Sequence, residues 1–114
     1  MKNRSIKTAK AFAILALVFF LASCLGPEKK VIPKSYTVEI KAMQFQPAEL
    51  SVQKGDTVLF VNQDMLVHNV TEEKAKAWGS PSLATGESYK MVVNESSDYY
   101  CSLHPVMKGK LVVQ

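Results

Sequence analysis

The chain has no acidic residue before Glu28, and this gap accounts for its basic character. Lys and Arg total 14 against 10 Asp and Glu, but four of the basic residues lie within the first ten positions. From residue 24 onward the two signs balance at ten each, so this part of the chain carries no net charge. A nucleic-acid-binding domain needs a basic surface. The charge distribution therefore argues against nucleic acid as a partner.

Long apolar runs and internal repeats are also missing. The longest apolar run, from Ala11 to Ala22, has 12 residues, whereas a membrane-spanning helix needs roughly 20. The 114 residues suffice for one domain. A single core of about 90 residues leaves little room for a cofactor-sized cleft. We therefore expect one small domain that is not an enzyme.

Residues 1–23 have the three parts of a secretory signal peptide: a basic start, an apolar stretch and small residues before a break. We expect this segment to be cleaved. Leu21-Ala22-Ser23-Cys24 resembles the lipobox of bacterial lipoproteins. This resemblance implies that Cys24 is lipidated, becomes the mature N-terminus and anchors the protein to a membrane. Two alternatives remain open, namely an uncleaved anchor and a disulfide between Cys24 and Cys101.

Residues 24–34 follow as a lipid-anchored tether, with Pro27 and Pro33 among charged residues. About ten residues in a partly extended form reach at most about 30 Å. The domain at 35–114 should therefore stay close to the membrane, on the periplasmic face or at the cell surface.

The domain consists of short runs rich in Val, Thr, Tyr and Phe, separated by Gly, Asp, Asn and Pro. In the first run Tyr36, Val38 and Ile40 alternate with polar residues, which is typical of a half-buried strand. Only Glu72 to Trp78 has the composition of a helical turn. We expect an all-β fold, a Greek-key antiparallel β-sandwich, with strands at 36–41, 49–53, 57–62, 67–71, 89–93, 99–101 and 110–113.

The residues with metal-binding chemistry are few. The chain has two histidines, His68 and His104, and one cysteine after Cys24. Cys101, His104 and Met107 form a C-x-x-H-x-x-M motif at the end of an expected strand and in the loop that follows. Thiolate and thioether suit Cu(I) and imidazole also accepts Cu(II), so this set with His68 predicts a single copper ion. Taken alone, each of these residues would more often be an ordinary core or surface residue.

These residues and their surroundings resemble the cupredoxins, the blue copper proteins that include plastocyanin and azurin, and most closely the amicyanin-like group. The matching segments are Val67–Val70, Gly86–Tyr89 and Tyr100–Lys110. The resemblance implies His68, Cys101 and His104 as equatorial copper ligands and Met107 as a weak axial ligand. It also implies that the backbone N–H of Asn69 donates to the cysteine sulfur.

The resemblance further implies a type 1 copper protein that carries one electron at a time between redox partners. The partner would be a redox protein such as a c-type cytochrome, a dehydrogenase or an oxidase, and the carrier a monomer. We expect His104 to be the electron port, within an apolar rim of Met65, Leu66, Leu103, Pro105 and Val106. A copper chaperone that delivers the ion to an extracytoplasmic cuproenzyme is the alternative, and an anchored adaptor is a third hypothesis.

Overall fold

The structure, a computed structural model, describes residues 30–114. The expected signal peptide, Cys24 and the first half of the expected tether lie outside the described residues. Within residues 30–114 no helix is long and apolar enough to cross a membrane.

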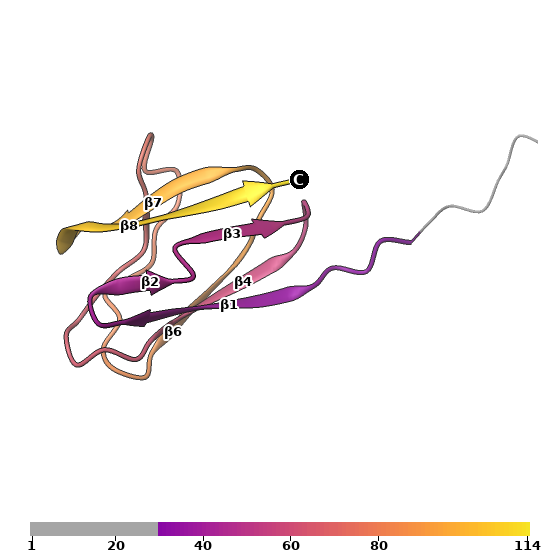
Figure 1. Ribbon diagram of the computed structural model, residues 1–114. Helices are drawn as coiled ribbons and strands as arrows, with labels where there is room; N and C mark the ends of the chain where they lie inside the picture. Colours follow the sequence, from indigo (N-terminus) through magenta and orange to yellow (C-terminus); the bar gives the residue numbers. More distant parts are fainter. Residues whose placement is uncertain (1–29) are drawn as a thin grey trace, which may run out of the picture. The chain divides into compact units, whose positions relative to one another are not determined.

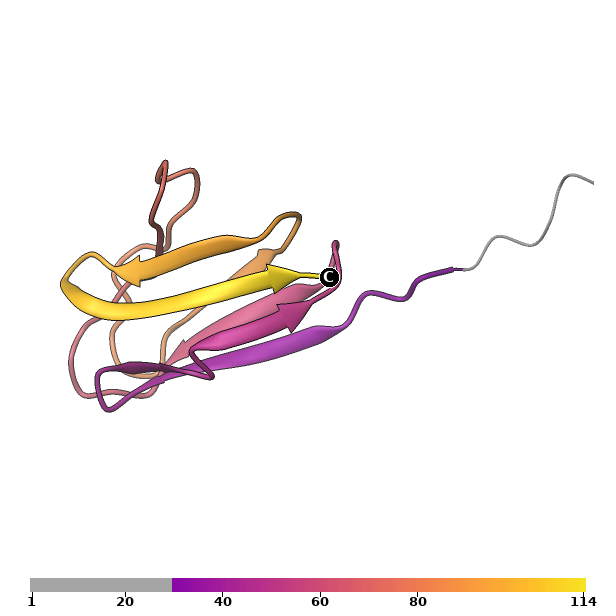
Figure 2. The same cartoon turned by 45° about the horizontal axis from the view of Figure 1, so that its top comes forward.

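The described residues form eight strands in two four-stranded sheets, which face each other as the layers of a sandwich (Figures 1 and 2). The first sheet has the order β2-β1-β4-β6 and the second the order β3-β8-β7-β5. The strands are β1 (Ser35–Lys41), β2 (Gln44–Gln46), β3 (Glu49–Val52), β4 (Thr57–Asn62), β5 (Thr71–Glu72), β6 (Ser88–Val92), β7 (Ser97–Cys101) and β8 (His104–Val113).

The expected all-β sandwich is confirmed, and its strand pairing is mixed. Strand β1 runs parallel to β4, and β3 runs parallel to β8, whereas the other pairs are antiparallel. A parallel pair requires a crossover connection. Between β1 and β4 the chain supplies one, because β2 stays in the first sheet and β3 crosses to the second.

The core lies between the sheets and is centred on an aromatic cluster. The ring of Tyr99 in β7 meets Phe45 of β2 edge-on at a centroid distance of 4.8 Å and Phe60 of β4 at 5.3 Å. Val38 and Ile40 point into the same core from β1, as their alternation predicts. The aromatic contacts therefore join strands of both sheets.

Several strand bounds differ from the expectation. Strand β4 has the expected bounds, whereas β8 begins at His104, six residues earlier than expected. The three-residue strand β2 was not expected. It forms because the chain turns back at Ala42 and Met43 and pairs antiparallel with β1.

The expected strand at 67–71 is wrong for most of its length. His68 makes an isolated bridge to Leu83, and β5 contains only Thr71 and Glu72. The reason lies in the backbone donors: the N–H of Asn69 points to the sulfur of Cys101, and the N–H of Val70 binds Ser80 Oγ. These two N–H groups are therefore not available for hydrogen bonds to a neighbouring strand.

The expected helical turn at Glu72–Trp78 is also wrong, since Glu72 ends β5 and residues 73–78 form bends and a loop. The carboxylate of Glu72 accepts hydrogen bonds from the backbone N–H groups of Lys74, Ala75 and Ala77. A helix would direct such groups to carbonyls of the preceding turn. The side chain thus replaces the helical pattern, as acidic residues do in turns.

The contact between Gly109 and Tyr99 gives a test of the core. A Cβ atom on Gly109 would overlap the Tyr99 ring, which lies directly across the β7–β8 ladder. We expect Gly109→Ala to lower the free energy of unfolding by about 1–3 kcal/mol through overpacking. Urea titration of both proteins would measure the difference.

Gly79 provides the matched control. A Cβ there would lie 3.6 Å from the carbonyl oxygen of Val70, an ordinary contact. Gly79→Ala should therefore change stability much less. Equal losses for the two variants would contradict the role assigned to the Tyr99 contact.

Candidate metal centre

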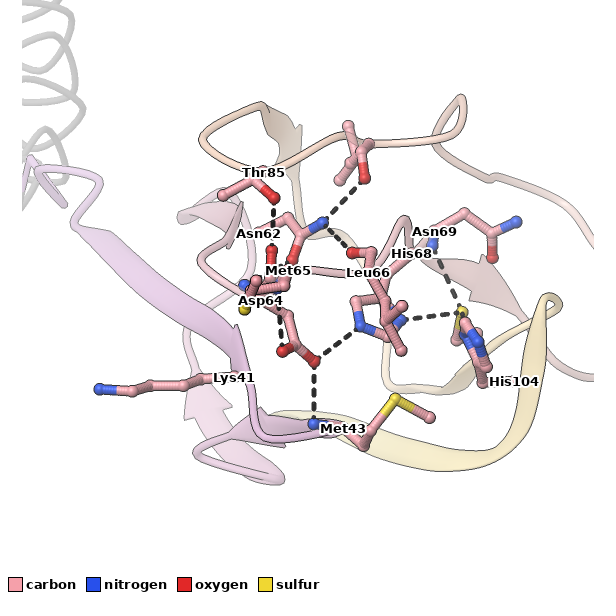
Figure 3. Close-up of polar contacts among 12 residues, drawn as sticks. Lys41, Met43, Asn62, Asp64, Met65, Leu66, His68, Asn69, Thr85 and His104 are labelled. Carbon is pink, nitrogen blue, oxygen red and sulfur yellow. Dashed lines mark hydrogen bonds and ion pairs between the residues drawn. The ribbon is translucent and has the colours of Figure 1, made fainter.

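Three side chains from two separate parts of the chain converge at one end of the sandwich. Cys101 ends β7, His104 begins β8, and His68 lies in the segment between β4 and β5. The donor atoms of all three lie within 4.8 Å of one another. The sulfur of Cys101 is 3.8 Å from Nδ1 of His68 and 3.8 Å from Nδ1 of His104. Figure 3 shows His68 and His104 directed toward the same sulfur atom.

These distances fit a metal ion between the three donors. For a first-row metal such as zinc, bonds of about 2.3 Å to sulfur and about 2.0 Å to nitrogen at about 120° separate the two ligand atoms by about 3.7 Å. The observed separations of 3.8 Å match this value. Two imidazoles and one thiolate in a plane form the trigonal set of blue copper sites. The donors therefore fit copper.

A two-residue turn holds two of the donors. Residues Ser102 and Leu103 connect β7 to β8, so Cys101 and His104 are paired across the end of the hairpin. The ladder shifts its register between Tyr100 and Cys101. His104 and Met107 thus belong to β8, not to the loop expected after the cysteine. The x-x spacing between Cys101 and His104 is the length of this turn.

Asn69 ties the His68 segment to this turn. Its backbone N–H lies 3.4 Å from the sulfur of Cys101. Its side-chain amide donates to Ser102 Oγ at 2.6 Å, and its Oδ1 accepts the backbone N–H of Ser102 at 2.8 Å. A hydrogen bond to the sulfur and a braced turn are features that orient a metal ligand and tune the metal.

Asp64 is a site residue that the sequence analysis missed. Its Oδ2 lies 2.9 Å from Nε2 of His68, the ring nitrogen opposite the one near Cys101. This hydrogen bond, followed by the one from the Met43 N–H, lowers the pKa of the Asp64 carboxyl from its ordinary value. The only signal in the sequence was a carboxylate four positions before an expected ligand. This spacing suggests a contact only when the conformation of the loop after β4 is known.

The donors differ in their access to solvent. His68 and Cys101 are 0% exposed, whereas His104 is partly exposed. Cys101 is a free thiol within the described residues. Met107 is buried on the inward face of β8, three residues after His104. The large apolar side chains expected to form a rim, Met65, Leu66, Leu103 and Val106, are exposed, Met65 and Val106 most of all at 92% and 85%.

Comparison with known proteins agrees with this donor set. The profile of the family described as "Copper binding proteins, plastocyanin/azurin family" matches residues 33–114. The chain belongs to this family. Copper is therefore the metal of the site, and the resemblance inferred from the motif is confirmed.

The curated relatives include three amicyanins. The chain is 32% identical to amicyanin of Paracoccus denitrificans over 75% of its own length and 70% of the relative. It is 31% identical to amicyanin-alpha of Methylorubrum extorquens over 97% of its own length and 99% of the relative. The match to amicyanin of Paracoccus versutus is 32% identical and spans 68% of this chain and 63% of the relative.

Solved structures that share the fold have sequence identities similar to those of these relatives. A mutant of amicyanin in the reduced Cu(I) form at pH 4 is 32% identical, with a TM-score of 0.66 over 75% of this chain and 87% of that chain. A purple cupredoxin from Nitrosopumilus maritimus is 28% identical, with a TM-score of 0.65 over 69% of this chain and 99% of that chain. A copper-containing nitrite reductase from Thermus scotoductus also matches, but over only 24% of its own length.

The thiolate gives a direct test of the site. A Cu(II)–thiolate bond in a constrained plane produces strong charge transfer, so the oxidised protein should be intensely blue with one copper per chain. Cys101→Ser should abolish the colour, because it removes the sulfur from the trigonal set. Visible absorption and metal analysis measure both quantities. Ser51→Ala, at an exposed position in β3 that pairs with Val112 near the far end of β8, should keep the colour, and a colourless wild-type protein loaded with Cu(II) would contradict the assignment.

Proposed function

We propose that this protein is a one-electron carrier that is held at a membrane by lipid on Cys24. Bound copper supplies a couple between Cu(I) and Cu(II). His68, Cys101 and His104 are its equatorial ligands in this proposal, and Met107 is a weak axial ligand that tunes the potential rather than holding the ion. The burial of the site, except at one imidazole edge, is the observation that supports this function most directly.

The partly exposed ring of His104 is the proposed electron port. His68 and Cys101 are fully buried, so the imidazole edge of His104 is the shortest route from the three donors to the surface. Burial of the donors also argues against a chaperone, because a site that hands on its ion must open to a competing ligand. The proposed role as a carrier also implies that the protein is not an enzyme.

The apolar rim around His104 supports brief docking of a redox partner. Exposed apolar patches on a soluble domain mark interaction sites, and small redox encounters use little surface. The proposed partner is a redox protein with an apolar face of its own, and docking would bring that face against the His104 edge. The proposed rim consists of Met65, Leu66, Leu103, Pro105 and Val106, all of which are exposed.

The rim can be tested by electron self-exchange between oxidised and reduced copies of the protein. Val106→Glu places a negative charge on both docking faces, so we expect the self-exchange rate to fall about tenfold or more through like-charge repulsion. Line broadening in NMR spectra of mixed oxidation states measures the rate. The visible spectrum should be unchanged.

The control is Val92→Glu. Val92 is exposed at the end of β6 and pairs with Thr57 at the start of β4, the end of that strand remote from the His68 segment. This change adds the same charge away from the rim and should leave the rate unaltered. Equal rates in both variants would refute docking through the rim.

The lipid anchor is a separate part of the proposal and is supported by the lipobox-like sequence before Cys24. We expect protein from the native host to begin at an acylated Cys24 and to sediment with membranes, because two or more acyl chains bind durably. Cys24→Ala should remain uncleaved or move to the soluble fraction. Mass spectrometry of the mature N-terminus decides the matter: an unmodified Cys24 would exclude the anchor while leaving the electron-carrier function intact.

A further inference from the structure

The carboxylate of Asp64 lies at a junction between His68 and the β1–β2 turn. Its Oδ2 accepts from Nε2 of His68 at 2.9 Å and from the backbone N–H of Met43 at 3.0 Å. Its Oδ1 accepts the backbone N–H of Met65 at 3.1 Å. The Asp64 side chain is 18% exposed, whereas that of His68 is fully buried. Figure 3 shows the carboxylate between Met43 and the His68 ring.

This contact selects one tautomer of His68. An ionised carboxylate only accepts hydrogen bonds, and a neutral imidazole carries one N–H. The proton of His68 must therefore be on Nε2, which leaves the lone pair of Nδ1 directed to the space beside the Cys101 sulfur. A metal ligand needs that lone pair. Asp64 thus prepares His68 for binding before any metal is present.

The position of Asp64 is itself fixed from several sides. Its backbone N–H donates to Asn62 Oδ1, and its carbonyl accepts from Thr85 Oγ1 at 2.6 Å. The amide of Asn62 in turn donates to the carbonyls of Leu66 and Leu83. These bonds close the segment between β4 and His68 into a braced loop.

The β1–β2 turn that contacts Asp64 has an uncommon backbone. Ala42 and Met43 have φ angles of 52° and 59°, a left-handed conformation that residues other than Gly, Asn and Asp rarely adopt. Such conformations persist only where the surroundings determine them. The Met43 N–H that donates to Asp64 belongs to this turn. This hydrogen bond therefore stabilises both the turn and the position of the carboxylate.

We propose that Asp64 is a positioning residue that orients His68 and strengthens its Nδ1 as a donor, favouring Cu(II) over Cu(I). The physical reason is that a negative charge bonded to the far side of an imidazole raises the basicity of the near nitrogen. Cu(II), the more highly charged oxidation state, gains more binding free energy from that increase in basicity than Cu(I) does. This role of Asp64 rests on the proposed ligation of copper by His68. Asp64 is the group that sets how strongly Nδ1 of His68 binds the ion.

The test compares midpoint potentials of the copper-loaded protein. Asp64→Asn keeps the size of the side chain and removes its charge. We expect the ratio of Cu(II) to Cu(I) affinity to fall about tenfold, the lower end of the usual effect of such partners, which raises the midpoint potential by about 59 mV. Asp64→Glu, which retains the carboxylate, should give a potential nearer to that of the wild-type protein.

Glu95→Gln is the charge-matched control, since Glu95 is an exposed carboxylate between β6 and β7. It removes the same charge without touching the site and should leave the potential unchanged. A potential for Asp64→Asn equal to that of Glu95→Gln would overturn the proposal. A merely structural role of Asp64 would lower stability without separating the Asn and Glu variants in potential.

A second measurement covers the case in which Asp64→Asn does not fold. In the diamagnetic Cu(I) wild-type protein, nitrogen-15 NMR should detect one His68 Nε2–H that exchanges slowly with solvent. Its absence would overturn the proposal whatever the variants do. A wild-type protein that shows this signal but no reversible one-electron wave would instead refute the electron-carrier function and leave the role of Asp64 standing.

Discussion

The packing of Tyr99 against Gly109 fixes the register on which the metal centre depends. Tyr99 and Cys101 lie on the same inward face of β7, and the residue opposite Tyr99 in β8 is Gly109. A slip of one residue would turn every side chain of β7 to the other face. Because the large ring fits only where the partner strand has no side chain, this contact sets the register of the hairpin up to Tyr100, and the shift in register that follows brings His104 opposite Cys101.

The third donor reaches the site by a different route. His68 follows β4 of the first sheet, whereas Cys101 and His104 belong to a hairpin of the second. Asn69 bonds to the turn of that hairpin, and Asp64 bonds to the turn between β1 and β2. The His68 ring and the Cys101 sulfur are therefore held by hydrogen bonds that do not require the metal, which is the preorganisation that a precise site needs.

The parts that could be predicted from the sequence are those governed by local pattern and residue chemistry. Alternation placed β1, the apolar run at 57–62 placed β4, and the rarity of His and Cys identified the three donors. The helical turn at Glu72–Trp78 was wrong because composition does not reveal that one carboxylate binds three backbone N–H groups. Asp64 was missed for a related reason: its partners Met43 and His68 become neighbours only through the loop after β4.

The hairpin between β7 and β8 also sets an order of assembly. β8 is the last strand of the domain, and it pairs with both β3 and β7 while contributing His104. During synthesis, Cys101 emerges before the residues of β8, and its thiol has no histidine partner from β8 until that strand docks. Binding of copper by all three donors would thus require that the final strand has been incorporated. A chain truncated after the cysteine would carry an unprotected thiol, open to oxidation or to the wrong metal.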